Sequence, residues 1–151
     1  MTKQQALKKA ESYCAYQERC HKEVKTKLYS LGLYKSDVEE IMAHLIEHGF
    51  LNEERFANEF VRGKFRIKKW GRKRLQLELR QRDISTYLIK TAISQIPDDE
   101  YIEAFNKLAE KKMTSLKSQP KLKQKRKLAD YLLYRGWESH LVYDKVNQLI
   151  D

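Results

Sequence analysis

A run of basic residues in the middle of the chain has the composition of a binding surface. Seven cations fall within eleven residues, with Phe65 and Trp70 among them: Lys64, Arg66, Lys68, Lys69, Arg72, Lys73 and Arg74. Each contact of such a cation with an anionic partner adds Coulombic attraction, and on nucleic acid it also releases counterions. The run therefore predicts contact with a phosphate backbone or with an acidic protein groove. Trp70, next to Gly71, suits either packing at a helix end or stacking on a base.

A helix just before this run would align further cations. Arg55, Arg62, Arg66 and Lys69 stand at offsets 0, 7, 11 and 14. At about 100° per residue they occupy a stripe roughly 60° wide. The opposite side carries Phe56, Phe60 and Ile67. The alternative is a solvated polar face, because the acidic residues Glu53, Glu54 and Glu59 can pair with cations on the same helix.

Residues with the chemistry of catalysis or metal binding are sparse. The segment from His44 to His48 matches the H-x-x-E-H pattern of one class of zinc peptidases. Five-residue patterns recur by chance, and no later segment indicates a third ligand, so we interpret both histidines as exposed helix residues. No phosphate-binding loop, dinucleotide turn or nucleophile elbow is present in the sequence. We therefore expect no enzyme activity, no cofactor and no metal.

Composition bounds the class of protein. The 151 residues carry a net charge of +10, and two cysteines, Cys14 and Cys20, are too few for a disulfide scaffold. No stretch approaches the length of a membrane span, and residues 1–10 lack the apolar centre of a signal peptide. We expect a reduced, cytoplasmic protein without a membrane partner. Residues 52–97 hold 12 basic and 5 acidic side chains, against 8 and 7 before them and 11 and 9 after them. The middle third thus carries most of the charge, which favours an anionic partner there.

One pattern of apolar residues occurs three times in the sequence, and the helices that it predicts must position the candidate binding residues. Its turn positions are Gly32, Asp83 and Gly136. Apolar residues stand eight and four places before each turn and one, six, ten and thirteen places after it. They are Val24, Leu28, Leu33, Val38, Met42 and Leu45; Leu75, Leu79, Ile84, Ile89, Ile93 and Ile96; and Leu128, Leu132, Trp137, Val142, Val146 and Leu149. These spacings place each set on one helix face, and the turn residue suits the left-handed conformation that commonly ends a helix. The chain is therefore a repeat protein.

Helix-capping residues, glycines and prolines predict three helices in each repeat. The first repeat, 1–51, predicts helices over 3–17, over 21–31 and from a capping box at Ser36 to Gly49. The second, 52–97, predicts a helix from a cap at Asn52 to about residue 70, another to residue 82 and a third after a cap at Ser85. In the third repeat, 98–151, Asp98 or Asp99 caps a helix, Pro120 starts the next and the last follows residue 137. We expect an all-α fold of three tandem three-helix repeats that forms an elongated, curved array.

A continuous motif joins the first two repeats. It runs from Gly49 to Ala57 as G-F-L-N-E-E-R-F-A, continues as Phe60-Val61-Arg62, and is followed by Gly71, Arg72, Leu75 and Leu79. This segment resembles the RecX family of bacterial recombinase regulators. Asp83 departs from the Gly that family members often carry at that turn, and the third repeat offers no sharp motif.

The resemblance implies a non-enzymatic modulator built from three tandem three-helix repeats. Such a protein binds RecA filaments on DNA, lies along the filament groove and inhibits strand exchange and ATP hydrolysis. The partners it implies are the RecA filament and single- and double-stranded DNA, and we expect a monomer. In the motif, Gly49, Phe56, Ala57 and Phe60 look structural, whereas contact by the arginines and Gly71 is a hypothesis.

The candidate DNA- or filament-binding residues form one set of nine: Arg55, Arg62, Lys64, Arg66, Lys68, Lys69, Arg72, Lys73 and Arg74. Two other functions fit the residues. One is an autonomous DNA-binding protein built from tandem helical modules. The other is a scaffold for protein partners only, for which the charges of the middle repeat would matter little.

Overall fold

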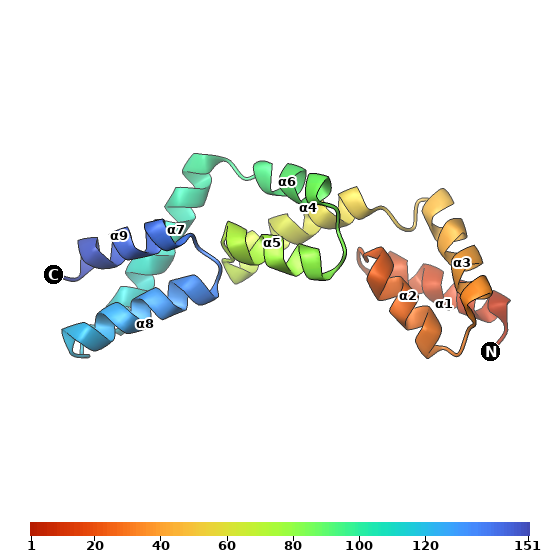
Figure 1. The fold of residues 1–151 in the computed structure, drawn as a ribbon, viewed down its shortest axis with the longest axis horizontal. Helices are drawn as coiled ribbons and strands as arrows, with labels where there is room; N and C mark the ends of the chain where they lie inside the picture. The colour runs from red at the N-terminus through yellow and green to blue at the C-terminus, as the bar shows by residue number, and fades with distance from the viewer. The chain divides into compact units, whose positions relative to one another are not determined.

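The computed structural model describes all of residues 1–151, and every regular element in it is helical (Figure 1). The elements are α1 (Lys3–Tyr16), α2 (His21–Ser30), α3 (Lys35–Glu47), α4 (Glu53–Gly63), the π-helix η1 (Lys64–Lys68), α5 (Arg72–Gln81), α6 (Thr86–Ser94), α7 (Asp98–Ser115), α8 (Lys121–Tyr134) and α9 (Ser139–Leu149). The all-α prediction is confirmed. The alternation of Leu75, Leu77 and Leu79 is helical, since the outer two are buried and Leu77 is exposed.

The repeat pattern forms the core of the protein. All of its apolar residues are buried except Leu149, which is half-buried. The three turn residues all adopt positive φ, at 87° for Gly32, 59° for Asp83 and 89° for Gly136. The left-handed turn predicted at these positions is therefore confirmed.

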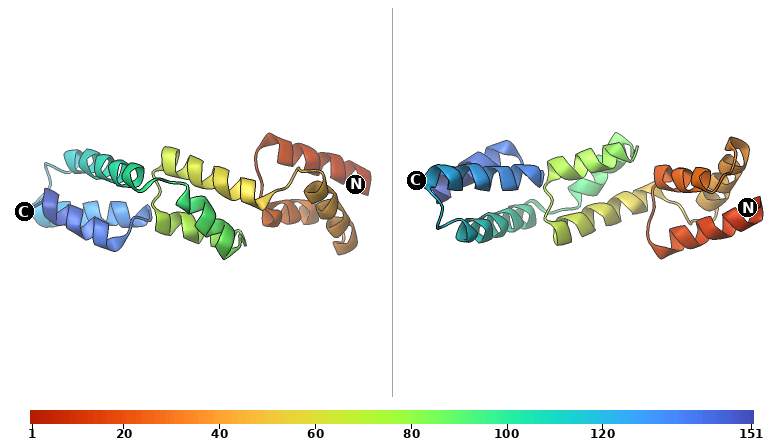
Figure 2. Two further views of the ribbon diagram at one scale, coloured as in Figure 1. Left: turned by 90° about the horizontal axis from the view of Figure 1, so that it is seen from above. Right: turned by 90° about the horizontal axis from the view of Figure 1, so that it is seen from below.

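The chain divides into two compact units. One comprises Met1–Phe60 and Leu79–Ile89, and the other Val61–Glu78 with Lys90–Asp151. In the first unit, α1, α2 and α3 pack on one another around Ala6, Ala10, Leu28 and Leu45 (Figure 2). In the second, α7, α8 and α9 pack together. Boundaries at 51/52 and 97/98 remain a prediction.

Aromatic side chains fill the core of the second unit. Trp137, at the turn between α8 and α9, is 1% exposed. Its ring centroid lies 4.6 Å from that of Tyr101 and 5.2 Å from that of Phe105, both on α7. The α8–α9 turn is thereby fixed against α7.

The structure confirms some of the predicted helix N-caps and contradicts others. Asn52 accepts a hydrogen bond from the Arg55 backbone N–H at 3.0 Å, and Ser85 accepts one from Leu88 at 3.2 Å, so both predicted caps are confirmed. The capping box at Ser36 is wrong, because α3 begins at Lys35 with Tyr34 as its N-cap. The cap at Asp98 or Asp99 is also wrong. Pro97 is the N-cap there, and the acidic residues occupy the first turn of α7, where they complement the helix dipole.

Candidate functional site

The basic run and Arg62 lie where the chain passes from the end of α4 through η1 into the start of α5. We call this segment, residues 62–74, the basic turn. The helix widens into the π-helix η1, and the chain then leaves it through Lys69, which adopts left-handed φ 60° and ψ 38°. Five cations of this turn are exposed and make no ion pair: Arg62, Arg66, Lys68, Lys69 and Lys73. The structure thus gathers uncompensated positive charge on one short segment.

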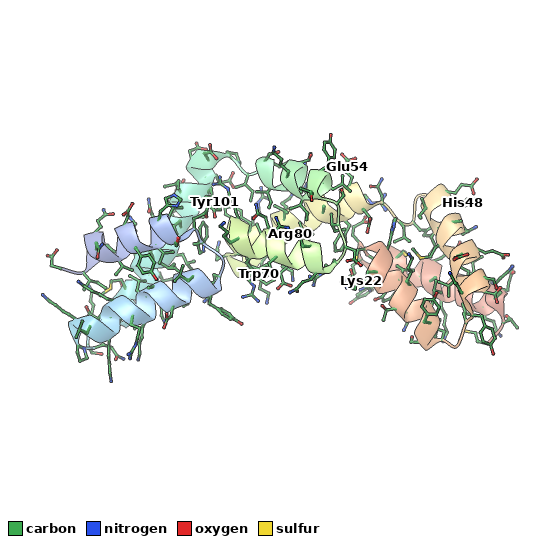
Figure 3. The ribbon with its side chains drawn as sticks, in the orientation of Figure 1. Lys22, His48, Glu54, Trp70, Arg80 and Tyr101 are labelled. Atoms are coloured by element: carbon green, nitrogen blue, oxygen red, sulfur yellow. The ribbon has the colours of Figure 1, made fainter.

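Trp70 lies within the basic turn, just before α5 (Figure 3). The Lys64 ammonium lies 5.4 Å from its ring centroid, and the Arg74 guanidinium lies 4.4 Å from it. Arg74 also donates a hydrogen bond to the Tyr134 carbonyl oxygen at 3.1 Å. Cations over an aromatic face are attracted by its quadrupole. Lys64 and Arg74 therefore surround a half-buried ring.

The backbone of the basic turn touches the α8–α9 turn directly. The Gly71 N–H donates to the Arg135 carbonyl oxygen at 2.7 Å, and the Lys73 N–H donates to that of Gly136 at 2.9 Å. A Cβ atom on Gly71 would lie 2.5 Å from the Gly136 oxygen, closer than real Cβ contacts allow. Only glycine fits at position 71.

Trp137 adds a further link to the basic turn. Its indole Nε1–H donates to the Lys69 carbonyl oxygen at 3.1 Å. The bond satisfies a backbone carbonyl at the left-handed residue, where the helix can no longer supply a donor. Third-domain residues therefore fix the shape of the segment that carries the free cations.

Arg72 is half-buried and lies in a network of ion pairs and hydrogen bonds, in which Glu138 is also half-buried and Asp98 is exposed. Its guanidinium lies 2.8 Å from the Asp98 carboxylate, 3.3 Å from that of Glu138 and 3.8 Å above the Tyr101 ring. The Tyr101 hydroxyl accepts the Arg72 backbone N–H at 2.8 Å and donates to Glu138 (Figure 3 labels Tyr101). Burial, and then the Glu138 hydrogen bond, raise the pKa of Tyr101 well above its usual value. The hydroxyl therefore stays protonated and keeps donating.

Arg55 is likewise engaged within its own unit. Its Nε donates to Glu18 at 2.6 Å, and Nη2 donates to the carbonyl oxygen of Gly49 at 3.0 Å. Of the four cations in the predicted helix stripe, Arg55 therefore already binds groups of the chain itself. Arg55 thus links the left-handed Gly49 turn to the loop that follows α1, where Glu18 lies.

A small cavity of about 80 Å³ lies beside Arg62 and Arg66. Buried Val61, Phe65 and Ile96 form its apolar part, and Gln95, Pro97 and Glu100 complete the lining. Two guanidinium groups beside an apolar surface can bind a carboxylate or phosphate together with an apolar group.

The histidines of the H-x-x-E-H segment and the two cysteines show no arrangement suited to metal binding or catalysis. His44 lies 3.0 Å from Glu11, its ring stacks on that of His48, and no group of three or more His, Cys, Asp or Glu side chains could hold a metal ion. Burial raises the pKa of the Cys14 thiol to about 11 and that of Cys20 to about 12. Thiols in this state are poor nucleophiles.

The residues that fix the basic turn were not identified from sequence. Tyr101, Trp137 and Glu138 lie 29 or more positions from their partners in the turn. One signal was present, because Trp137 occupies a repeat position that holds Leu33 and Ile84 in the other two repeats. An indole in place of an aliphatic side chain indicates a position with a polar partner.

The fold and site define an all-helical protein of three-helix domains, in which a basic turn is hydrogen-bonded to the α8–α9 turn. The chain matches the family models for the second three-helix domain of RecX over residues 52–93 and for the third over residues 98–146. It belongs to the RecX family of non-enzymatic regulatory proteins.

Relatives and a solved structure agree with this membership. A regulatory protein RecX of Prosthecochloris aestuarii is 28% identical over 145 residues, which cover 96% of this chain and 93% of that protein. The Lactobacillus johnsonii relative is 31% identical over 99 residues, or 66% of this chain and 36% of that protein. The crystal structure of RecX from Lactobacillus salivarius superposes with a TM-score of 0.80 at 25% identity, covering 97% of this chain and 96% of that one. No helix here has the length and apolar character to cross a membrane.

Proposed function

We propose that the chain binds RecA filaments on DNA and lowers their ATP hydrolysis and strand exchange. Membership of the RecX family supports this function. The single observation that carries the assignment to a surface is the group of five exposed cations of the basic turn that make no ion pair. An acidic protein groove or a phosphate backbone complements such a group.

The nine candidate cations take different parts in this proposal. Arg62, Arg66, Lys68, Lys69 and Lys73 contact the filament, because their charges have no partner within the chain. Lys64 and Arg74 flank Trp70 at the rim of the same surface. Arg55 and Arg72 act through positioning, since their guanidinium groups bind carboxylates of the chain itself.

The test is ATP hydrolysis by preformed filaments on single-stranded DNA while this protein is titrated in below stoichiometry. Binding to bare DNA is measured in the same buffer. Loss of hydrolysis well below the concentration that saturates bare DNA supports a filament target. Loss only at saturation of bare DNA would instead favour the autonomous DNA-binding protein.

A set of variants links the activity to the basic turn. Replacing Arg62, Arg66, Lys68, Lys69 and Lys73 with Ala should abolish the inhibition, because the charges that meet the filament are gone, while helix content stays unchanged. The matched control replaces five exposed lysines on other helices and loses the same net charge: Lys25, Lys35, Lys90, Lys107 and Lys123. Equal inhibition by both variants would contradict the role of the basic turn.

A further inference from the structure

An open groove of about 500 Å³ lies on the first three-helix domain, along α1 and α2. Its lining contains four cations, two tyrosines, one serine and no acidic residue: Lys8, Lys9, Ser12, Tyr13, Tyr16, Arg19 and Lys27. The groove lies outside the residues that the two RecX domain models match. The basic turn has no part in it.

The carboxylates near the groove bind other groups of the chain, so they do not neutralise the groove cations. Glu11 bonds to His44 at 3.0 Å and Glu18 to Arg55 at 2.6 Å, while Glu23 accepts the Cys20 backbone N–H at 3.2 Å. None of the four groove cations forms an ion pair. Residues 1–51 carry nearly balanced charge, 8 basic against 7 acidic side chains. The groove is therefore a positively charged surface on a domain whose total charge is close to zero.

Arg19 and Tyr13 form a preorganised part of this surface. The Arg19 guanidinium carbon lies 3.7 Å from the Tyr13 ring centroid, and Nε donates to the Tyr13 carbonyl oxygen at 3.0 Å. Both terminal nitrogens of Arg19 remain without a partner in the chain. The Lys27 ammonium lies 5.6 Å from the same ring. Two cations are therefore held around one ring, and an anion that binds them meets a geometry already fixed.

Tyr16 is the feature that selects the partner. It lies at the last residue of α1, its side chain is 83% exposed, and its ring has no partner. An exposed ring beside fixed cations is the arrangement that binds single strands, where cations follow the backbone and bases stack on aromatic faces. The bases of a duplex are already stacked on one another.

We propose that the groove of α1 and α2 is a second binding site, which takes a single-stranded nucleic acid through phosphate contacts with its cations and base stacking on Tyr16. This inference goes beyond the proposed function because it concerns a different surface of the chain. It holds whether or not the basic turn contacts a filament.

The test uses the full chain with the basic turn neutralised by the five alanine substitutions, and a fluorescent twelve-residue oligothymidine as probe. Tyr16→Ala should weaken binding roughly fivefold or more, the loss expected for one stacked base. The matched control is Tyr34→Ala, since Tyr34 is 82% exposed in the same domain but outside the groove. Equal affinities of the two variants would overturn the proposal.

Two further measurements separate base recognition from general anion attraction. An abasic strand of the same length should bind roughly fivefold more weakly, because stacking is lost while the phosphates remain. Equal binding of the abasic strand would overturn the proposal in favour of a general anion surface. Lys8→Ala with Lys9→Ala should lower the salt dependence, whereas Lys25→Ala with Lys35→Ala should not.

A photocross-linking experiment on the otherwise unaltered chain covers the case in which the neutralised variant does not fold. Oligothymidine containing 4-thiothymidine should cross-link to peptides of α1 and α2 that include Tyr16. Cross-links confined to residues 62–74 would overturn the proposal for the groove. They would leave the proposed function of the basic turn intact, so the two failures are distinguishable.

Discussion

Single residues decide how closely the basic turn approaches the α8–α9 turn. Gly71 is the clearest case, because its N–H donates at 2.7 Å to Arg135 and any Cβ would meet the Gly136 oxygen. The same chain provides a contrasting glycine. Gly63, near the end of α4, has ordinary helical angles and nothing within 4 Å of a Cβ.

These two glycines give opposite predictions. Gly71→Ala should lower the free energy of unfolding by about 2 kcal/mol, because the backbones must separate to admit the methyl group. Gly63→Ala should raise it by up to about 1 kcal/mol, since alanine loses less entropy in a helix. Urea denaturation followed by circular dichroism measures both. A Gly71→Ala protein as stable as the original would contradict the close approach.

The two cysteines predict a pH dependence of thiol reactivity. Burial raises the pKa of Cys14 to about 11 and that of Cys20 to about 12, from an ordinary value of 9.0. The folded chain therefore holds these protons more tightly than the unfolded chain. The stability that this contributes is present below pH 9 and is lost as pH rises through the folded values.

Modification by an aromatic disulfide reagent checks this prediction. At pH 8.5 the native thiols should react about a hundredfold or more slowly than in urea, because the thiolate is the reacting form. Native reactivity should then rise steeply above pH 10. A small-molecule thiol, measured alongside, corrects for the reagent's own pH dependence. Similar rates in native and unfolded protein would show that both thiols are accessible.

At the scale of elements, the three left-handed turns are equivalent but not equally favourable. Asp83 holds φ 59° where Gly32 and Gly136 stand in the other repeats. A side chain in this conformation carries a steric cost that glycine avoids. The Asp83 carboxylate lies 3.9 Å from the Lys22 ammonium, but both side chains are largely exposed, and such pairs contribute little.

Asp83→Gly should therefore raise the free energy of unfolding by up to about 1 kcal/mol. Asp83→Ala serves as the control, because it removes the same carboxylate and keeps a Cβ at positive φ. The alanine variant should be less stable than the glycine variant in thermal denaturation. The reverse order would mean that the carboxylate, not the backbone, decides stability at this turn.

Sequence periodicity predicted these turns because the repeats share a helical register and a turn position. The same reasoning did not predict η1 or the left-handed Lys69, since neither a π-helix nor a lysine at positive φ has a local signature. Ser36 was a misleading cap signal, because α3 starts at Lys35. Propensity at a helix end is a weak preference that neighbouring packing readily overrides.

The nine candidate cations show a second limit of sequence reasoning. Charge and spacing located the segment, but they could not separate Arg72 from Lys73. Arg72 is identified as a positioning residue only by Asp98, Tyr101 and Glu138, which the fold brings from α7 and the start of α9. Ion pairs between distant segments depend on tertiary packing, and a single sequence does not display them.

At the scale of the whole molecule, net charge and local contact make different contributions to binding. The chain carries +10 in total, so any polyanion is attracted at low salt. Local contacts differ because each phosphate that a cation neutralises releases condensed counterions. The salt dependence of affinity therefore counts contacts, whereas net charge alone changes the long-range attraction that salt screens.

Titration of the full chain with single-stranded DNA at several salt concentrations separates the two contributions. Replacing the five free cations of the basic turn with alanine should reduce the slope of log affinity against log salt by about 3.5, at roughly 0.7 per contact. The variant with five scattered lysines replaced loses the same net charge and should keep most of the original slope. If both variants lower the slope equally, binding depends on total charge, and the basic turn is no specific surface. A smaller loss confined to the basic-turn variant would instead count how many of its five cations touch phosphate.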